Sequence, residues 1–187
     1  IGRYYYEVEF YKQKKFISSI IFTVLGIAII VTFIIWVYSN KISVLLFESD
    51  KYSYLVRLSA IWTIFAALKP IFTVLMRFEK KPFYFLTISV IEVIIRVFLT
   101  IILVVFYHTG IIGVIWGQLI GTIIGIIGYY LLLNKKIIFK YDFEWLKKIL
   151  KYSLPLLPAL ILYHLNKNLI RKIIGYFLGN SELGIFS

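Results

Sequence analysis

The sequence contains no cysteine among its 187 residues, and it has only two histidines, His108 and His164. Without cysteine the chain has no disulfide framework, no thiolate metal site and no cysteine nucleophile. The two histidines are not at metal-ligand spacing and no carboxylate cluster accompanies them, so we expect no zinc site. A phosphate-binding loop of the form GxxxxGK[ST] is also missing, which excludes a P-loop ATPase in this sequence. We therefore expect neither a metal nor a cofactor.

Charged residues are scarce as well, at 16% of the chain, whereas hydrophobic residues make up 61%. The mean hydropathy of +0.89 lies outside the range of ordinary soluble domains and indicates an integral membrane protein. The formal net charge of +12 would suggest nucleic-acid binding in a soluble protein. Here the basic residues lie mostly in short connections between apolar runs, as in membrane proteins, so we expect no nucleic-acid partner.

Apolar runs of about 20 residues are long enough to cross a bilayer as helices. Four runs are clear, at residues 16–38, 54–76, 83–107 and 111–133. A fifth run, 153–178, has the right length but contains two prolines and several polar groups, so a re-entrant or peripheral helix is the alternative. We predict an all-α polytopic membrane protein, a partial helical bundle with about five transmembrane helices. The absence of an initiator Met and of a closing segment leads us to expect a fragment of a longer protein.

Basic residues concentrate in alternate connections, which predicts the orientation in the membrane. Residues 1–15, 77–82 and 135–151 are rich in Lys and Arg and are predicted to be cytoplasmic, whereas 39–53 and 107–110 are predicted to be external. Within the last basic segment, residues 141–153 have the pattern of a short amphipathic helix on the inner membrane surface, although a basic loop is equally compatible. We expect a multi-pass protein of the cytoplasmic membrane.

Polar residues form a stripe on the third apolar run. Ser89, Glu92, Arg96 and Thr100 fall within an arc of roughly 80° on one side of a helix. A charge at mid-span costs about 2.5 to 3.5 kcal/mol, so the stripe should face protein or water and not lipid. Glu92 and Arg96 either neutralise each other at i, i+4 spacing or line a polar path. Lys69, in the second run, either adds a deep cation or extends to the cytoplasmic edge.

The fifth run carries a stronger cationic face. His164, Lys167, Asn168 and Arg171 lie within about 100° of one another, and no acid in the segment neutralises them. This face needs water, a distant carboxylate or an anionic ligand. The fourth run repeats glycine every fourth residue, which indicates close helix packing and permits sliding, and Gln118 on its side is a secondary cavity candidate.

Three short segments resemble a known family. They are "GRYYYE" at residues 2–7, "LKYSLPLLPA" at 150–159 and "IRKIIGYFLGNSELGIFS" at 170–187. In this order and spacing they resemble a polysaccharide or O-antigen flippase of the multidrug/oligosaccharidyl-lipid/polysaccharide exporter superfamily. Arg171 matches the family arginine, whereas Ile170 stands where the family usually has aspartate, which puts an ion-coupling role of that acid in doubt.

The resemblance implies a two-bundle transporter that moves a lipid-linked anionic oligosaccharide, such as a polyprenyl-pyrophosphate sugar, by alternating access. Residues 1–134 would belong to the first bundle, 135–152 to a cytoplasmic connection and 153–187 to the first helix of the second bundle. The expected partners are the lipid-linked substrate, the bilayer and polysaccharide assembly proteins. We expect a transporter and no enzyme, with substrate-binding residues Arg96, Glu92, Lys167, Arg171, Asn168, His164, Gln118 and Lys69. The alternatives are a multidrug or cation exporter, a membrane polysaccharide polymerase or ligase, and a membrane scaffold.

Overall fold

The computed structural model describes residues 10–138, 140–163 and 165–166, and every regular element among them is helical. Four long helices dominate: α1 (Phe10–Val37), α3 (Ser53–Phe78), α4 (Pro82–Ile101) and α5 (Ile111–Leu133). A π-helical turn, η2 (Ile102–Phe106), directly follows α4 and extends this helix to Phe106. All four are long and apolar enough to cross a membrane. The predicted all-α polytopic membrane fold is therefore confirmed.

The first four predicted spans coincide closely with these helices, and α5 begins and ends at the predicted residues. Of the fifth predicted span, 153–178, the structure describes the short 3-10 helix η4 (Leu154–Leu156) and the helical residues 157–163, 165 and 166. The rest of that span lies outside the described residues.

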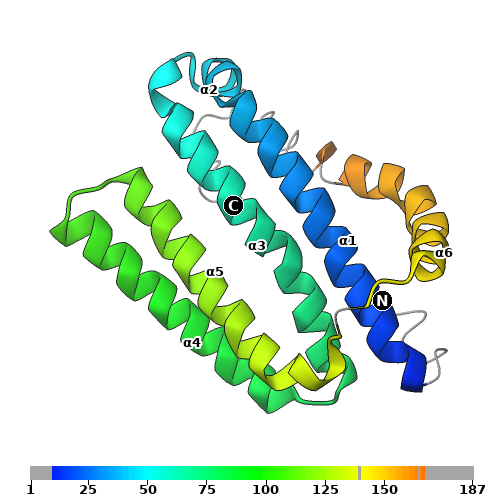
Figure 1. The fold of residues 1–187 in the computed structure, drawn as a ribbon. Coiled ribbons are helices and arrows are strands. Elements are labelled where there is room, and N and C mark those ends of the chain that lie inside the picture. The colour runs from blue at the N-terminus through cyan, green and yellow to red at the C-terminus, as the bar shows by residue number, and fades with distance from the viewer. Residues whose placement is uncertain (1–9, 139, 164, 167–187) are drawn as a thin grey trace. The chain divides into compact units, whose positions relative to one another are not determined.

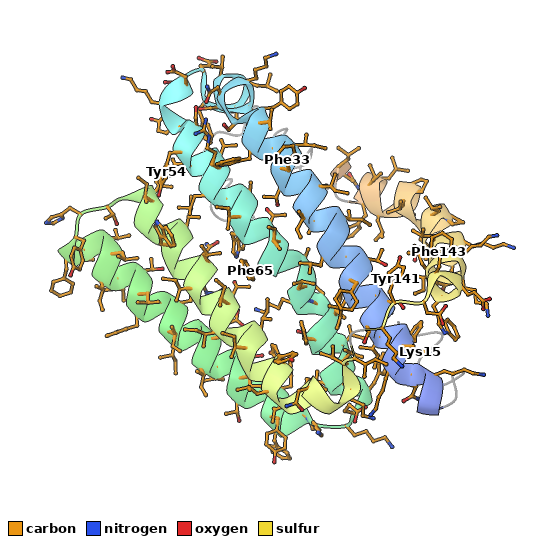
Figure 2. The ribbon with its side chains drawn as sticks, viewed as in Figure 1. Lys15, Phe33, Tyr54, Phe65, Tyr141 and Phe143 are labelled. Atoms are coloured by element: carbon orange, nitrogen blue, oxygen red, sulfur yellow. The ribbon has the colours of Figure 1, made fainter. Side chains whose placement is uncertain are left out.

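The long helices lie side by side in the order α1, α3, α5 and α4 (Figure 1). α3 packs against α1 on one side and α5 on the other, and it also touches α4. The most fully buried apolar side chains lie at the start of α1, the end of α3 and the end of α5, including Phe16, Met76 and Leu133. By the predicted orientation, the core sits toward the cytoplasmic end. Phe33 and Tyr54, labelled in Figure 2, are more than half exposed, as expected for lipid-facing and interfacial side chains.

The first connection that is predicted to be external forms the short helix α2 (Ser39–Phe47) and the 3-10 turn η1 (Asp50–Tyr52). Arg57 near the start of α3 links the α2–η1 segment to the helix bundle. Its Nε donates a hydrogen bond of 2.8 Å to Ser39 Oγ, and its guanidinium lies 5.8 Å from the ring centroid of Trp36. Ser39 is fully buried and accepts this charged donor. Arg57 therefore acts as an anchor at the helix end, as an arginine near a membrane interface commonly does.

The chain after α5 is fastened to α1 at the predicted cytoplasmic side. Past the turn η3 (Asn134–Lys136), the Ile138 N–H donates to Ser18 Oγ and the Asp142 N–H donates to Ser19 Oγ, each at 2.9 Å. Both serines are buried, so they satisfy backbone donors that would otherwise lack partners.

The chain divides into two compact units between Asp142 and Phe143. The second unit begins with α6 (Phe143–Ser153), which confirms the short amphipathic helix predicted for this segment. Lys148 lies with its Nζ 4.9 Å from the ring centroid of Trp145 on the same helix.

Candidate functional site

The polar stripe of α4 faces the glycine repeat of α5. A Cβ added at Gly121 would lie 2.8 Å from Arg96 Cβ, and one added at Gly125 would lie 2.6 Å from Glu92 Oε2. A Cβ at Gly117 would meet the Thr100 hydroxyl, and Ser89 Oγ shares a hydrogen bond of 2.8 Å with Tyr129 OH of α5. The absence of side chains at these glycines lets the two helix backbones approach closely. The prediction that the stripe points toward protein is confirmed for Glu92, which is 1% exposed.

Glu92 pairs with a residue of another helix. Lys69 Nζ of α3 lies 2.5 Å from Glu92 Oε1, and the Lys69 side chain remains 34% exposed. Lys69 is nine residues from the end of α3 and Glu92 ten from the start of α4, so both lie about 15 Å from the turn between the helices. That depth is about half of a 30 Å hydrocarbon core. Mutual neutralisation of Glu92 and Arg96 is therefore not the arrangement found, and Lys69 engages Glu92 instead of extending to the edge.

The second carboxylate oxygen of Glu92, Oε2, is buried and lacks a hydrogen-bond partner among the described residues. It points at Gly125, where only the missing side chain leaves space for it. A buried carboxylate with one unpartnered oxygen is stabilised mainly by its cation, so Glu92 depends on Lys69.

Arg96 is the deep cation whose charge is not offset. It is partly buried on α4, and within the described part of the chain its guanidinium takes part in no ion pair or hydrogen bond. The nearest acid along the helix, Glu92, is already held by Lys69. The described spans therefore combine one acid and two cations at depth, leaving a net charge of +1. Arginine is suited to phosphate because its planar guanidinium donates two parallel hydrogen bonds.

Gln118 lies on α5 one residue beyond Gly117 and is partly buried. Its backbone carbonyl accepts a hydrogen bond of 2.8 Å from the Thr122 hydroxyl, and Thr122 Oγ1 in turn accepts from Trp62 Nε1 of α3 at 3.2 Å. With Thr32 Oγ1 donating to the Ala60 carbonyl at 2.9 Å, each neighbouring pair of long helices has a polar link. These links are of the kind that joins helices in lipid.

Four predicted site residues lie outside the described residues: His164, Lys167, Asn168 and Arg171. The structure brings Lys69, Glu92 and Arg96 into one region of α3 and α4, and Gln118 lies on the helix that packs against α4. The pairing of Lys69 with Glu92 was not predicted. A sequence signal for it exists, because Lys69 is 11 residues before Lys80 and Glu92 is 11 residues after Lys81, so a tight turn at 80–81 places them at equal depth.

An apolar cavity of about 590 Å³ lies apart from these charges, toward the predicted external ends of the helices. It is lined by residues of α1, α2, α3 and the start of α5, among them Ile35, Leu46, Ala60 and Ile111. None of the predicted site residues lines it.

A family model described as a polysaccharide biosynthesis protein matches residues 9–187, which is nearly the whole chain. None of the curated proteins and none of the solved structures matches the chain.

Proposed function

From its membership of the polysaccharide biosynthesis protein family, to which the chain belongs by a match over residues 9–187, we propose that it moves a lipid-linked anionic oligosaccharide across the cytoplasmic membrane. The family and the four spanning helices establish a role in polysaccharide biosynthesis by a multi-pass membrane protein. The resemblance predicted from three short segments is thereby confirmed at the level of the family. Translocation, the polyprenyl-pyrophosphate substrate and alternating access are our proposal.

The uncompensated Arg96 is the observation that carries this proposal. A lone guanidinium in a spanning helix is expensive unless water or an anion meets it, so its presence favours an anionic ligand in a hydrated cleft. A cation exporter would need an accessible deep acid, and the one acid deep in the described spans, Glu92, is buried and paired with Lys69. An anionic substrate therefore fits this half of the protein better than a cationic one.

In the proposed mechanism, Arg96 offsets part of the pyrophosphate charge, and Lys167 and Arg171 of the fifth predicted span offset more of it. Asn168, His164 and Gln118 donate and accept hydrogen bonds with sugar hydroxyls, while the lipid tail stays in the bilayer. Alternating access would come from rocking of two bundles about the bound head group, as in transporters built from repeated halves.

The test uses the complete protein in cells whose surface polysaccharide depends on it. Arg96→Gln and Arg171→Gln should each abolish surface polysaccharide and leave lipid-linked intermediates in the cell, with unchanged protein in the membrane. Arg96→Lys, which keeps the charge and loses the planar fork, should retain part of the export. Arg57→Gln is the matched control, because Arg57 binds Ser39 at the helix end. Normal polymer output from both Gln variants at sites 96 and 171 would refute the proposal.

A further inference from the structure

We propose that Glu92 acts as a built-in counter-anion that neutralises (masks) the charge of Lys69. It thereby lowers the affinity of this half of the protein for a diphosphate. This inference rests on the proposed function and extends it, because it assigns to one residue the affinity for the anionic head group. Glu92 would then determine how many uncompensated positive charges α3 and α4 offer to the substrate: one, from Arg96, with Glu92 in place, and two without it.

The pair is asymmetric in a way that suits this role. The Glu92 side chain is 1% exposed, whereas the Lys69 side chain is 34% exposed, so the cation is the member that a ligand can reach. An ammonium group has three donor hydrogens, and in the described residues Glu92 Oε1 takes one of them. A phosphate oxygen can therefore approach Lys69 from its open side, in competition with the carboxylate behind it.

Glu92 is held in position by the packing of α5. Its carboxylate lies against Gly125, where a Cβ would be 2.9 Å from Glu92 Cδ, and Gly121 lies close to the Glu92 carbonyl. Tyr129, the nearest titratable group that α5 presents to the stripe, is engaged with Ser89. The unpartnered Oε2 therefore has no alternative donor in the described residues, and Lys69 is the residue with which Glu92 forms an ion pair there.

Weak binding is useful in a transporter. A substrate with two or more negative charges that met Arg96 and an unmasked Lys69 together would be held by two charge-assisted contacts and released slowly. A buried acid beside one of the cations lowers that affinity without removing the cation. Glu92→Gln should therefore tighten diphosphate binding and slow export, which a purely structural ion pair would not do.

The experiment measures binding of inorganic pyrophosphate to the purified complete protein in phosphatidylcholine nanodiscs by calorimetry, with polysaccharide export measured in cells. Glu92→Gln should bind pyrophosphate between about fivefold and about 150-fold more tightly than the wild type, the range typical of coupling between neighbouring sites. Glu92→Asp keeps the charge and should bind as the wild type does. Lys69→Gln in the Glu92→Gln background should cancel the gain, since the gain requires the unmasked ammonium.

The outcomes separate this inference from the proposed function. Unchanged or weaker pyrophosphate binding by Glu92→Gln, together with loss of export in Arg96→Gln, overturns the masking role and leaves the transport proposal standing. Normal export by Arg96→Gln and no pyrophosphate binding by any variant defeats both. If phosphatidylglycerol in the nanodiscs removes the gain of Glu92→Gln, a bulk lipid head group occupies Lys69 and the assignment to the substrate diphosphate is wrong.

A second variant tests the same inference in case Glu92→Gln does not fold. Exchanging the pair, with Lys69→Glu and Glu92→Lys together, preserves an ion pair at the same place and turns the accessible group from a cation into an anion. This exchange should weaken pyrophosphate binding about tenfold or more relative to the wild type, a penalty within the range for coupled sites. Unaltered binding by the folded exchange variant would overturn the inference.

Discussion

Replacing Gly125 by alanine should destabilise the protein, although alanine is the better helix former. A Cβ at this position would lie 2.6 Å from Glu92 Oε2 and 2.9 Å from Glu92 Cδ, closer than side-chain atoms pack. Overpacking of this kind costs about 1–3 kcal/mol. The gain in helix propensity from Gly to Ala returns at most about 1 kcal/mol. Any displacement of Glu92 from Lys69 adds to the loss, because a buried carboxylate that loses its cation is left uncompensated.

Subtracting the helix-propensity gain from the overpacking cost, we expect Gly125→Ala to lower the free energy of unfolding by up to about 2 kcal/mol, and by more if Glu92 is displaced from Lys69. The assay is thermal unfolding of the complete protein in detergent, followed by the fraction that remains monodisperse on size exclusion. Gly26→Ala is the matched control, because a Cβ at Gly26 of α1 would meet no atom within 4 Å. That variant should be as stable as the wild type or slightly more stable.

A background that lacks the Glu92 side chain tests whether contact with Glu92 causes the destabilisation by Gly125→Ala. Glu92→Ala removes the atoms that the new Cβ would meet, so Gly125→Ala should have almost no further effect in a Lys69→Met, Glu92→Ala background. Coupled effects of this kind are what neighbouring residues show. If Gly125→Ala is as stable as Gly26→Ala, or if its effect persists in that background, then the close approach of α4 and α5 at Glu92 is wrong.

Three further outcomes follow from other contacts. Lys69→Met alone should destabilise the protein by leaving Glu92 buried without its cation, by less than the about 3–5 kcal/mol of a fully buried pair because the Lys69 side chain is 34% exposed, and Lys69→Met with Glu92→Leu should recover most of that loss in the same thermal assay. Tyr129→Phe should cost about 0.5–1.5 kcal/mol by removing the Ser89 hydrogen bond, with Tyr130→Phe as the neutral control, since Tyr130 is exposed. Ser18→Ala with Ser19→Ala should speed amide hydrogen exchange at Ile138 and Asp142 about fivefold or more, as expected from the loss of about 1 kcal/mol or more per bond; unchanged exchange would mean that α1 does not hold this segment.

The fold was largely predictable from the sequence because the bilayer imposes a length on each apolar run. Residues 111–133 illustrate this: the predicted span and α5 have the same ends, since Gly110 precedes the run and polar Asn134 follows it. The connection at 39–53 was less predictable. Its apolar residues are too few to span a membrane, and α2 forms there because it packs on α3, a tertiary contact that local pattern does not contain.

The candidate site was predictable only in part. Helical periodicity placed Glu92 and Arg96 on one inward-facing stripe, and the structure buries Glu92 accordingly. Periodicity describes one helix at a time, however, so the partner it could offer for Glu92 was Arg96 on the same helix, with a polar path as the alternative. The choice of Lys69 depends on how α3 and α4 meet across their turn and on how closely Gly125 admits the carboxylate.

The glycine repeat and the charges of α4 form one arrangement. A carboxylate in a spanning helix needs both a cation and a seal against lipid. Lys69 supplies the cation from α3. The α5 backbone at Gly121 and Gly125, which has no side chains there, packs closely on α4 and separates Glu92 from lipid. Glu92 then cancels one of the two deep cations, so the positive charge that remains uncompensated in the described spans belongs to Arg96. A side chain at Gly125 would disturb that balance as well as the packing, which links the stability of the α4–α5 contact to the charge offered to an anionic ligand.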